Sequence, residues 1–162
     1  ISSAAQKQLM EQLQNAITTQ GVPGAVAFCN TNAFPILQKT GAGFGVPIRR
    51  TSNDYRNPAN QPTEDEKALL EAYEYNEKNQ IKNEPNVQKI KDGSILLYTK
   101  AITIPSRLCL NCHGMPGTDI NKATLEKIKE LYPGDKANGH QIGDLRGMWS
   151  ISIPHKEIVN RL

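Results

Sequence analysis

The segment Cys109-Leu110-Asn111-Cys112-His113 constrains this chain more than any other feature of its sequence. Two cysteines three positions apart, followed at once by a histidine, form the pattern for covalent attachment of a c-type haem. The two thiols lie about one helical turn apart, so they can reach the two vinyl groups on one edge of a porphyrin. The adjacent imidazole can then coordinate the iron. We therefore predict one covalent haem c per chain, attached to Cys109 and Cys112, with His113 as an axial ligand.

Paired cysteines have two other common uses, a redox disulfide and a zinc site. The thioredoxin-like disulfide motif opens a helix inside a βαβ unit, and no such unit is predicted before Cys109. Zinc could take Cys29 as a ligand together with Cys109 and Cys112, but structural zinc sites normally use two spaced pairs of ligands, and a second pair is missing. We therefore favour haem attachment over both alternatives.

The second axial position of the iron has several candidate ligands. Met115 is excluded, because two residues span only about 7 Å and cannot pass around the porphyrin to its far face. Met10 lies on the apolar side of an expected helix, where a methionine usually fills the core. His155 follows a proline near the carboxyl end and is expected at the surface. The remaining candidates are Cys29, His140 and Met148.

Cys29 has the best local argument among these candidates. It lies in a segment expected to be extended, where it would share one face with Ala25 and Ala27. Small side chains on that face would leave room for a flat ring beside the thiolate. The alternative interpretation is a buried structural cysteine, which is a common fate of a free thiol.

The two haem propionates would need cationic and hydrogen-bonding partners. A polar segment that follows a glycine-rich stretch supplies guanidinium groups, hydroxyls and an amide close together in the chain. The candidates are Arg49, Arg50, Thr51, Ser52, Arg56 and Asn57. The alternative interpretation is a solvated basic turn.

Hydrophobic periodicity predicts the first half of the fold. Apolar residues between 9 and 17 share one helical face, and Gly21 and Pro23 are expected to end that helix. The apolar stretches 25–29 and 36–40 are predicted to be a pair of strands. Residues 41–60 contain several glycines, prolines and polar residues, so this segment is predicted to be irregular.

The second half of the chain shows clearer signals. Thr63 and Glu66 form a capping box, which predicts a helix to about Asn79. Residues 94–104 and 148–153 are predicted to be strands, and Asn121 is predicted to cap another helix. Strands separated by helices favour an α+β fold, an antiparallel sheet with helices packed to one side, in a single domain over residues 1–162.

Composition excludes several functional classes. The net charge of +3 is spread along the chain, so binding to nucleic acid has no support. No apolar run reaches the length needed to cross a bilayer. We find no Ser/His/Asp arrangement, carboxylate pair or nucleotide loop, so no enzyme activity is predicted. The chain starts at Ile1 without a signal sequence, and we expect that a leader has been removed.

Five segments together resemble one known family. They are residues 27–30, 50–52 with 56–60, 109–114, 135–139 and 143–147. This combination is similar to the bacterial c-type haem domains with a PAS-like fold, which include stand-alone cyanobacterial proteins and sensor modules of histidine kinases. The resemblance implies a PAS-like antiparallel sheet flanked by helices, and His/Cys ligation in which Cys29 takes the sixth position. We expect the chain to be exported to the periplasm or the thylakoid lumen. His140 stands where the family usually has an aromatic residue, and it is the second candidate ligand.

Two functions are consistent with such a haem protein. We expect a redox or gas sensor, and the alternative is a soluble low-potential electron carrier. The chain carries no kinase segment, so a sensor would act through a separate signalling or redox partner. A peroxidase-like enzyme would need an open distal site, which a bound Cys29 would block.

Overall fold

The computed structural model describes residues 1–156, which form four helices, one short 3₁₀ helix and four strands. A four-stranded antiparallel sheet has the order β1-β4-β3-β2. The strands are β1 (Ile48–Thr51), β2 (Asn86–Ile90), β3 (Ile95–Thr103) and β4 (Leu145–Pro154). The α+β fold with an antiparallel sheet is therefore confirmed.

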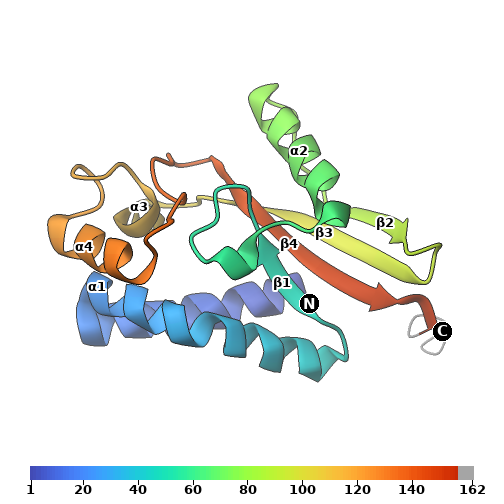
Figure 1. Ribbon diagram of the computed structural model, residues 1–162, viewed down its shortest axis with the longest axis horizontal. Helices are drawn as coiled ribbons and strands as arrows, with labels where there is room; N and C mark the ends of the chain where they lie inside the picture. The colour runs from blue at the N-terminus through green and yellow to red at the C-terminus, as the bar shows by residue number, and fades with distance from the viewer. Residues whose placement is uncertain (157–162) are drawn as a thin grey trace.

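Helices cover both faces of the sheet, and not one face as expected from the sequence (Figure 1). Trp149 and Ile151 pack with residues of α1 (Ser2–Phe44), while Met148 packs with residues of α2 (Glu64–Lys78) on the opposite face. Successive side chains of a strand point to opposite faces, so β4 contributes to two separate apolar clusters. The remaining helices, α3 (Arg107–His113) and α4 (Lys122–Leu131), lie together beside the middle of α1, where its two halves meet (Figure 1).

The helix α1 (Ser2–Phe44) replaces the predicted strand pair, so the strands expected at 25–29 and 36–40 are wrong. Its two halves meet at a kink at Gly21, which has φ 72° and ψ 176°, and they run side by side (Figure 1). The hydroxyl of Thr40 donates to Gln8 Oε1 at 2.8 Å across the two halves. Short apolar runs are compatible with a buried helix as well as with a strand, and here packing between the halves decides for the helix.

The clearer signals of the second half are confirmed. The helix α2 (Glu64–Lys78) begins with the predicted capping box, in which the Thr63 amide donates to Glu66 Oε2 at 2.8 Å. Asn121 caps α4 (Lys122–Leu131) by accepting from the Thr124 amide. Strand β3 lies within the strand predicted at 94–104, and β4 includes the strand predicted at 148–153.

Besides the 3₁₀ helix at Pro58–Asn60, two strands and one helix are not predicted from the sequence. Strand β1 lies inside the segment expected to be irregular, and β2 lies in a polar connection. Both are edge strands of four or five residues, and their pairing with β4 and β3 is a tertiary feature. The third element is the short helix α3 (Arg107–His113), which carries the cysteine pair. No described helix is both long and apolar enough to cross a membrane.

Candidate functional site

Helix α3 presents Cys109 and Cys112 one turn apart, directly after the loop that ends β3. Both thiols are free and partly exposed. Burial raises the pKa of Cys112 to about 11, and the positive charge of Arg56 only partly opposes this effect. At neutral pH the sulfur therefore carries its proton, and a small helix holds two thiols at the spacing that the sequence predicts.

The imidazole of His113, the last residue of α3, is held by the chain itself. Its Nδ1 lies 2.8 Å from the carbonyl oxygen of Ala137. A carbonyl can only accept, so Nδ1 carries the proton and Nε2 is the nitrogen with the free lone pair. Burial, together with the charges of Arg146 and Arg56, holds the pKa of His113 well below its usual value. The ring is therefore neutral, with the tautomer that a metal-binding histidine normally has.

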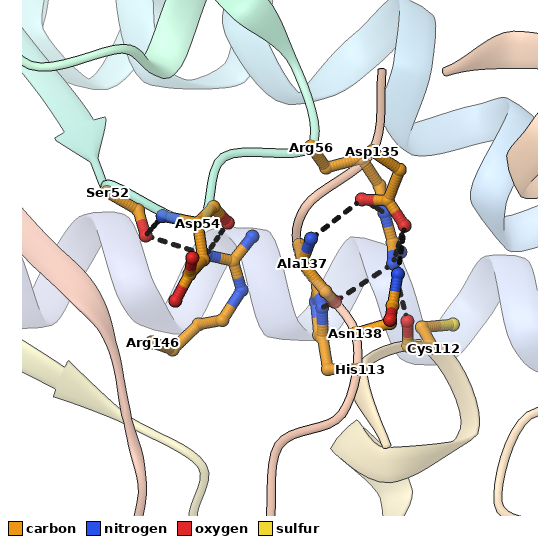
Figure 2. Close-up of polar contacts among 9 residues, drawn as sticks. All are labelled: Ser52, Asp54, Arg56, Cys112, His113, Asp135, Ala137, Asn138 and Arg146. Carbon is orange, nitrogen blue, oxygen red and sulfur yellow. Dashed lines mark hydrogen bonds and ion pairs between the residues drawn. The ribbon is translucent and has the colours of Figure 1, made fainter. Parts of the chain in front are cut away.

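An ion pair with little solvent exposure lies beside this histidine (Figure 2). Arg56 donates from Nε to Asp135 Oδ1 at 3.0 Å and from Nη2 to Asp135 Oδ2 at 3.2 Å. The same Nη2 also donates to the carbonyl oxygens of Cys112 at 2.6 Å and Ala137 at 3.1 Å. Arg56 was predicted as a propionate partner, but in this structure its Nε and Nη2 donate to acceptors of the protein.

Two other buried arginines keep an unused donor. The Nε atoms of Arg50 and Arg146 are buried and have no hydrogen-bond partner among residues 1–156. Arg146 donates from Nη1 to Ser52 Oγ at 3.1 Å and to the Asp54 carbonyl oxygen at 3.0 Å (Figure 2). Burial is the main reason that the pKa of Arg146 falls to about 10, and the positive charges of Arg56 and Arg50 contribute to this lowering. Buried donors without partners are rare, and an anion that is not part of the polypeptide would explain these two.

The other predicted propionate partners serve the polypeptide in different ways. Thr51 is buried and donates its hydroxyl to the Asn60 carbonyl oxygen at 3.0 Å. Asn57 caps the 3₁₀ helix η1 (Pro58–Asn60) by accepting from the Ala59 amide. Arg49 forms an ion pair with Glu66 at 3.1 Å. Ser52 accepts from the Asp54 amide and from Arg146, and neither bond uses its own hydroxyl proton.

Cys29 lies on the second half of α1, so the face that it was expected to share with Ala25 and Ala27 in a strand does not exist. Val26, one turn before Cys29, belongs to the apolar cluster of α1 and α4 against which Cys112 packs. Burial raises the pKa of Cys29, while the charges of Arg50 and Arg56 lower it. The fold therefore brings Cys29 close to the cysteine pair and the arginines.

His140, the second candidate ligand, lies beside His113. Their ring centroids are 6.4 Å apart, at an interplanar angle of 75°. The His140 amide donates to the His113 carbonyl oxygen at 2.9 Å, and its Nε2 is buried without a hydrogen-bond partner in the described part of the chain. Burial lowers the pKa of His140, as does the charge of Arg146.

Two charged residues of this site lie outside the predicted set. Arg146 is the second residue of β4, in a stretch whose sequence indicates a turn, and Asp135 follows α4 in a segment that ends the helix. Neither position has a periodicity or local pattern that marks a buried charge. The only sequence signal is that both lie in segments that carry the family resemblance.

The two alternative uses of the cysteines gain no support from the structure. Strand β3, which precedes α3, is antiparallel to both of its neighbours, so the parallel unit of a thioredoxin-like motif does not occur there. Within residues 1–156, no three His, Cys, Asp or Glu side chains are grouped so that they could hold a metal ion.

Comparisons with known proteins agree on one relationship. The model of the Tll0287-like family matches residues 2–154. The crystal structure of the cyanobacterial haem protein Tll0287 aligns with a TM-score of 0.61 and 24% sequence identity, over 95% of this chain and 95% of that chain. At this identity the alignment establishes a shared fold. No curated protein matches the chain.

Proposed function

Because the chain belongs to the Tll0287-like family, we propose that it is a c-type haem protein that attaches its cofactor through Cys109 and Cys112. The observation that carries this proposal is the state of His113. His113 follows Cys112 directly, and its Nδ1 donates to the Ala137 carbonyl oxygen at a nitrogen–oxygen distance of 2.8 Å. The other ring nitrogen, Nε2, is therefore the atom available to iron. When bound, the haem would supply an iron that changes oxidation state and can take small ligands.

Cys109 and Cys112 would each add a thiol across one vinyl group. In this addition the sulfur bonds to one vinyl carbon and the proton goes to the other. The raised pKa of Cys112 is consistent with a protonated thiol before attachment.

We assign the sixth ligand to Cys29 in preference to His140. The backbone of His140 is hydrogen bonded to that of His113, so both rings start from adjacent positions on one side of the site. A second residue that holds the iron would therefore come from another element. Cys29 on α1 meets this requirement, and the nearby charges of Arg50 and Arg56 oppose the rise in its thiol pKa that burial causes. A thiolate at this position would thus have cations nearby.

We assign the propionates to Arg50, Arg146 and Ser52, and not to Arg56. Two buried Nε donors without partners and one hydroxyl proton suit carboxylate oxygens. The guanidinium of Arg56 is bound to Asp135 and to backbone oxygens, so its charge is balanced within the protein. Thr51 and Asn57 are also left out of the propionate site, because their side chains are hydrogen bonded to nearby backbone groups.

As its role we propose a redox or small-ligand sensor in an oxidising compartment, the periplasm or the thylakoid lumen, acting on a separate protein. The position of Cys29 favours a sensor over an electron carrier. It lies on α1, which contacts both α4 and β1. Ferric iron binds a thiolate strongly, and reduction weakens this bond because the metal loses one positive charge. Release of Cys29 would therefore open a coordination site and loosen an element that also covers the sheet.

Attachment is tested on the protein produced in a host that matures c-type cytochromes. Haem should stay with the wild-type polypeptide in denaturing electrophoresis, and its pyridine adduct should show the spectrum of a porphyrin with two saturated vinyl groups. Cys109→Ser and Cys112→Ser should each shift this spectrum toward a haem with one free vinyl group. Cys29→Ser is the matched control, since this thiol forms no bond to the porphyrin edge. Complete loss of haem from the denatured wild-type chain contradicts the proposal.

A further inference from the structure

We propose that the Arg56–Asp135 ion pair is a positioning device for His113, which fixes the carbonyl that receives its Nδ1 proton and so sets how strongly the imidazole donates to iron. This inference rests on the proposed haem function. It concerns a pair of residues that would touch neither the porphyrin nor the metal.

Asp135 organises the loop that carries the acceptor. Its carboxylate accepts from the Ala137 amide at 3.0 Å and from Asn138 Nδ2 at 3.2 Å, in addition to both bonds from Arg56. The side chain is only 8% exposed. Four donors on one buried carboxylate fix the backbone at residues 135–138, and with it the direction of the Ala137 carbonyl.

Arg56 connects this loop to the end of α3. Its Nη2 lies 2.6 Å from the Cys112 carbonyl oxygen and 3.1 Å from that of Ala137, and its side chain is 11% exposed. One rigid guanidinium thus holds the residue before His113 and the acceptor of the His113 proton (Figure 2). The same cation therefore restrains both the peptide group before His113 and the carbonyl oxygen that accepts from His113 Nδ1.

The shared carbonyl links this geometry to the electronic state of the ring. A stronger acceptor at Nδ1 makes an imidazole more basic and favours ferric iron. Here the Ala137 oxygen accepts from His113 and from cationic Arg56 together, so it is a weaker acceptor for His113 than a carbonyl bound to the ring alone. Asp135 keeps this arrangement neutral overall, because its carboxylate balances the guanidinium charge.

The two halves of the pair should therefore shift the midpoint potential in opposite directions. Arg56→Gln removes the second donor from the Ala137 oxygen and leaves a carboxylate uncompensated, and both effects favour ferric iron and lower the potential. Asp135→Asn leaves a guanidinium uncompensated, which disfavours ferric iron and raises the potential.

Charge alone would also give opposite shifts, so a neutral double variant separates charge from positioning. Arg56→Gln/Asp135→Asn has the net charge of the wild type but lacks the bridge between α3 and the loop. We expect its ferric electron paramagnetic resonance spectrum to contain more than one low-spin species, because the His113 ring is no longer held in one orientation. Arg56→Lys keeps the charge, yet one ammonium cannot reproduce the planar fork, and the same heterogeneity should appear.

Lys136→Gln is the matched control. This substitution removes a positive charge next to Asp135. In the wild type, Lys136 Nζ lies 4.6 Å from the centroid of the Tyr55 ring, outside the hydrogen bonds between Arg56 and Asp135. This variant should keep a single ferric species. The inference is overturned if the double variant has the wild-type midpoint potential and one ferric species with the wild-type paramagnetic resonance spectrum. If the double variant does not fold, a wild-type spectrum in Arg56→Lys overturns it. Covalent haem in the wild type is scored separately on denaturing gels, so failure of the haem proposal is recognised independently.

Discussion

The guanidinium of Arg146 lies 3.1 Å from the hydroxyl oxygen of Ser52 and joins the start of β4 to the end of β1, while its Nε remains buried and unpaired within the described chain. Arg50, on β1, has the same unpaired Nε. These arginines come from distant parts of the chain, since 94 positions separate Ser52 from Arg146. Their spare donors make this side of the site suited to anions.

Neutralising either arginine should lower the midpoint potential. In Arg50→Gln and Arg146→Gln a propionate loses its compensating charge, which stabilises the ferric state. The expected shift is on the order of tens of millivolts, measured by spectroelectrochemical titration. Arg107→Gln is the control, because Arg107 is exposed on α3 and its charge is screened by solvent. An unchanged potential in both variants would return these arginines to a structural role.

Substitution of Cys29 should remove the spectrum of a thiolate-bound ferric haem. We expect the wild type to be low-spin with a thiolate-type spectrum, and Cys29→Ser to lose these features because a hydroxyl is a far weaker ligand. Carbon monoxide should bind the ferrous wild type and bind Cys29→Ser faster.

Two outcomes would redirect this assignment. An intact ferric spectrum in Cys29→Ser would make His140 the next ligand to test. A ferrous wild type that stays six-coordinate and excludes carbon monoxide would remove the switch and favour the electron carrier.

Asp135→Asn should destabilise the fold by about 3 kcal/mol at pH 7, since it leaves the buried guanidinium of Arg56 unpaired. Burial raises the pKa of Asp135, but the hydrogen bonds and charge of Arg56 outweigh this, so the pKa lies below its ordinary value of 3.8. A carboxyl with a depressed pKa stabilises the fold above its unfolded pKa and loses this effect as the pH falls through its folded pKa.

The stability difference between the wild type and Asp135→Asn should therefore narrow only below about pH 3.8. Urea unfolding across this range measures it. Asp119→Asn is the control, because Asp119 is exposed and accepts from the Met115 amide, and its loss should cost about 1 kcal/mol. A difference that stays constant down to pH 3 would contradict the depressed pKa.

Gly21→Ala should destabilise the chain by about 1–3 kcal/mol, measured by chemical denaturation. At φ 72° and ψ 176°, Gly21 occupies a region that is open almost only to glycine. A Cβ there would meet only ordinary contacts, so the cost is one of backbone strain. Gly43→Ala, inside α1 with open space around it, should be neutral or stabilise by roughly 0.5 kcal/mol. Equal effects of the two substitutions would contradict the kink.

The sequence by itself determined those features whose signals are local. The capping box of Thr63 and Glu66 defines the start of α2, because both partners lie within one helical turn. Alternating apolar residues define β4, and Asn121 defines the start of α4. The cysteine spacing and the adjacent His113 identify the candidate haem motif for the same reason, since five consecutive residues contain the whole pattern.

Tertiary structure decided the remaining features, because each of them depends on partners that are distant in the chain. Residues 25–29 are helical because the second half of α1 packs on α4 and on its own first half, which a short apolar run cannot reveal. β1 is a strand only because β4 pairs with it. Arg56 is paired with the carboxylate of Asp135, which lies 79 positions further along the chain. Arg146 Nε has no hydrogen-bond partner within residues 1–156, so the two arginines have different roles. A sequence shows that a charge is present, but only the folded chain determines which charges are balanced.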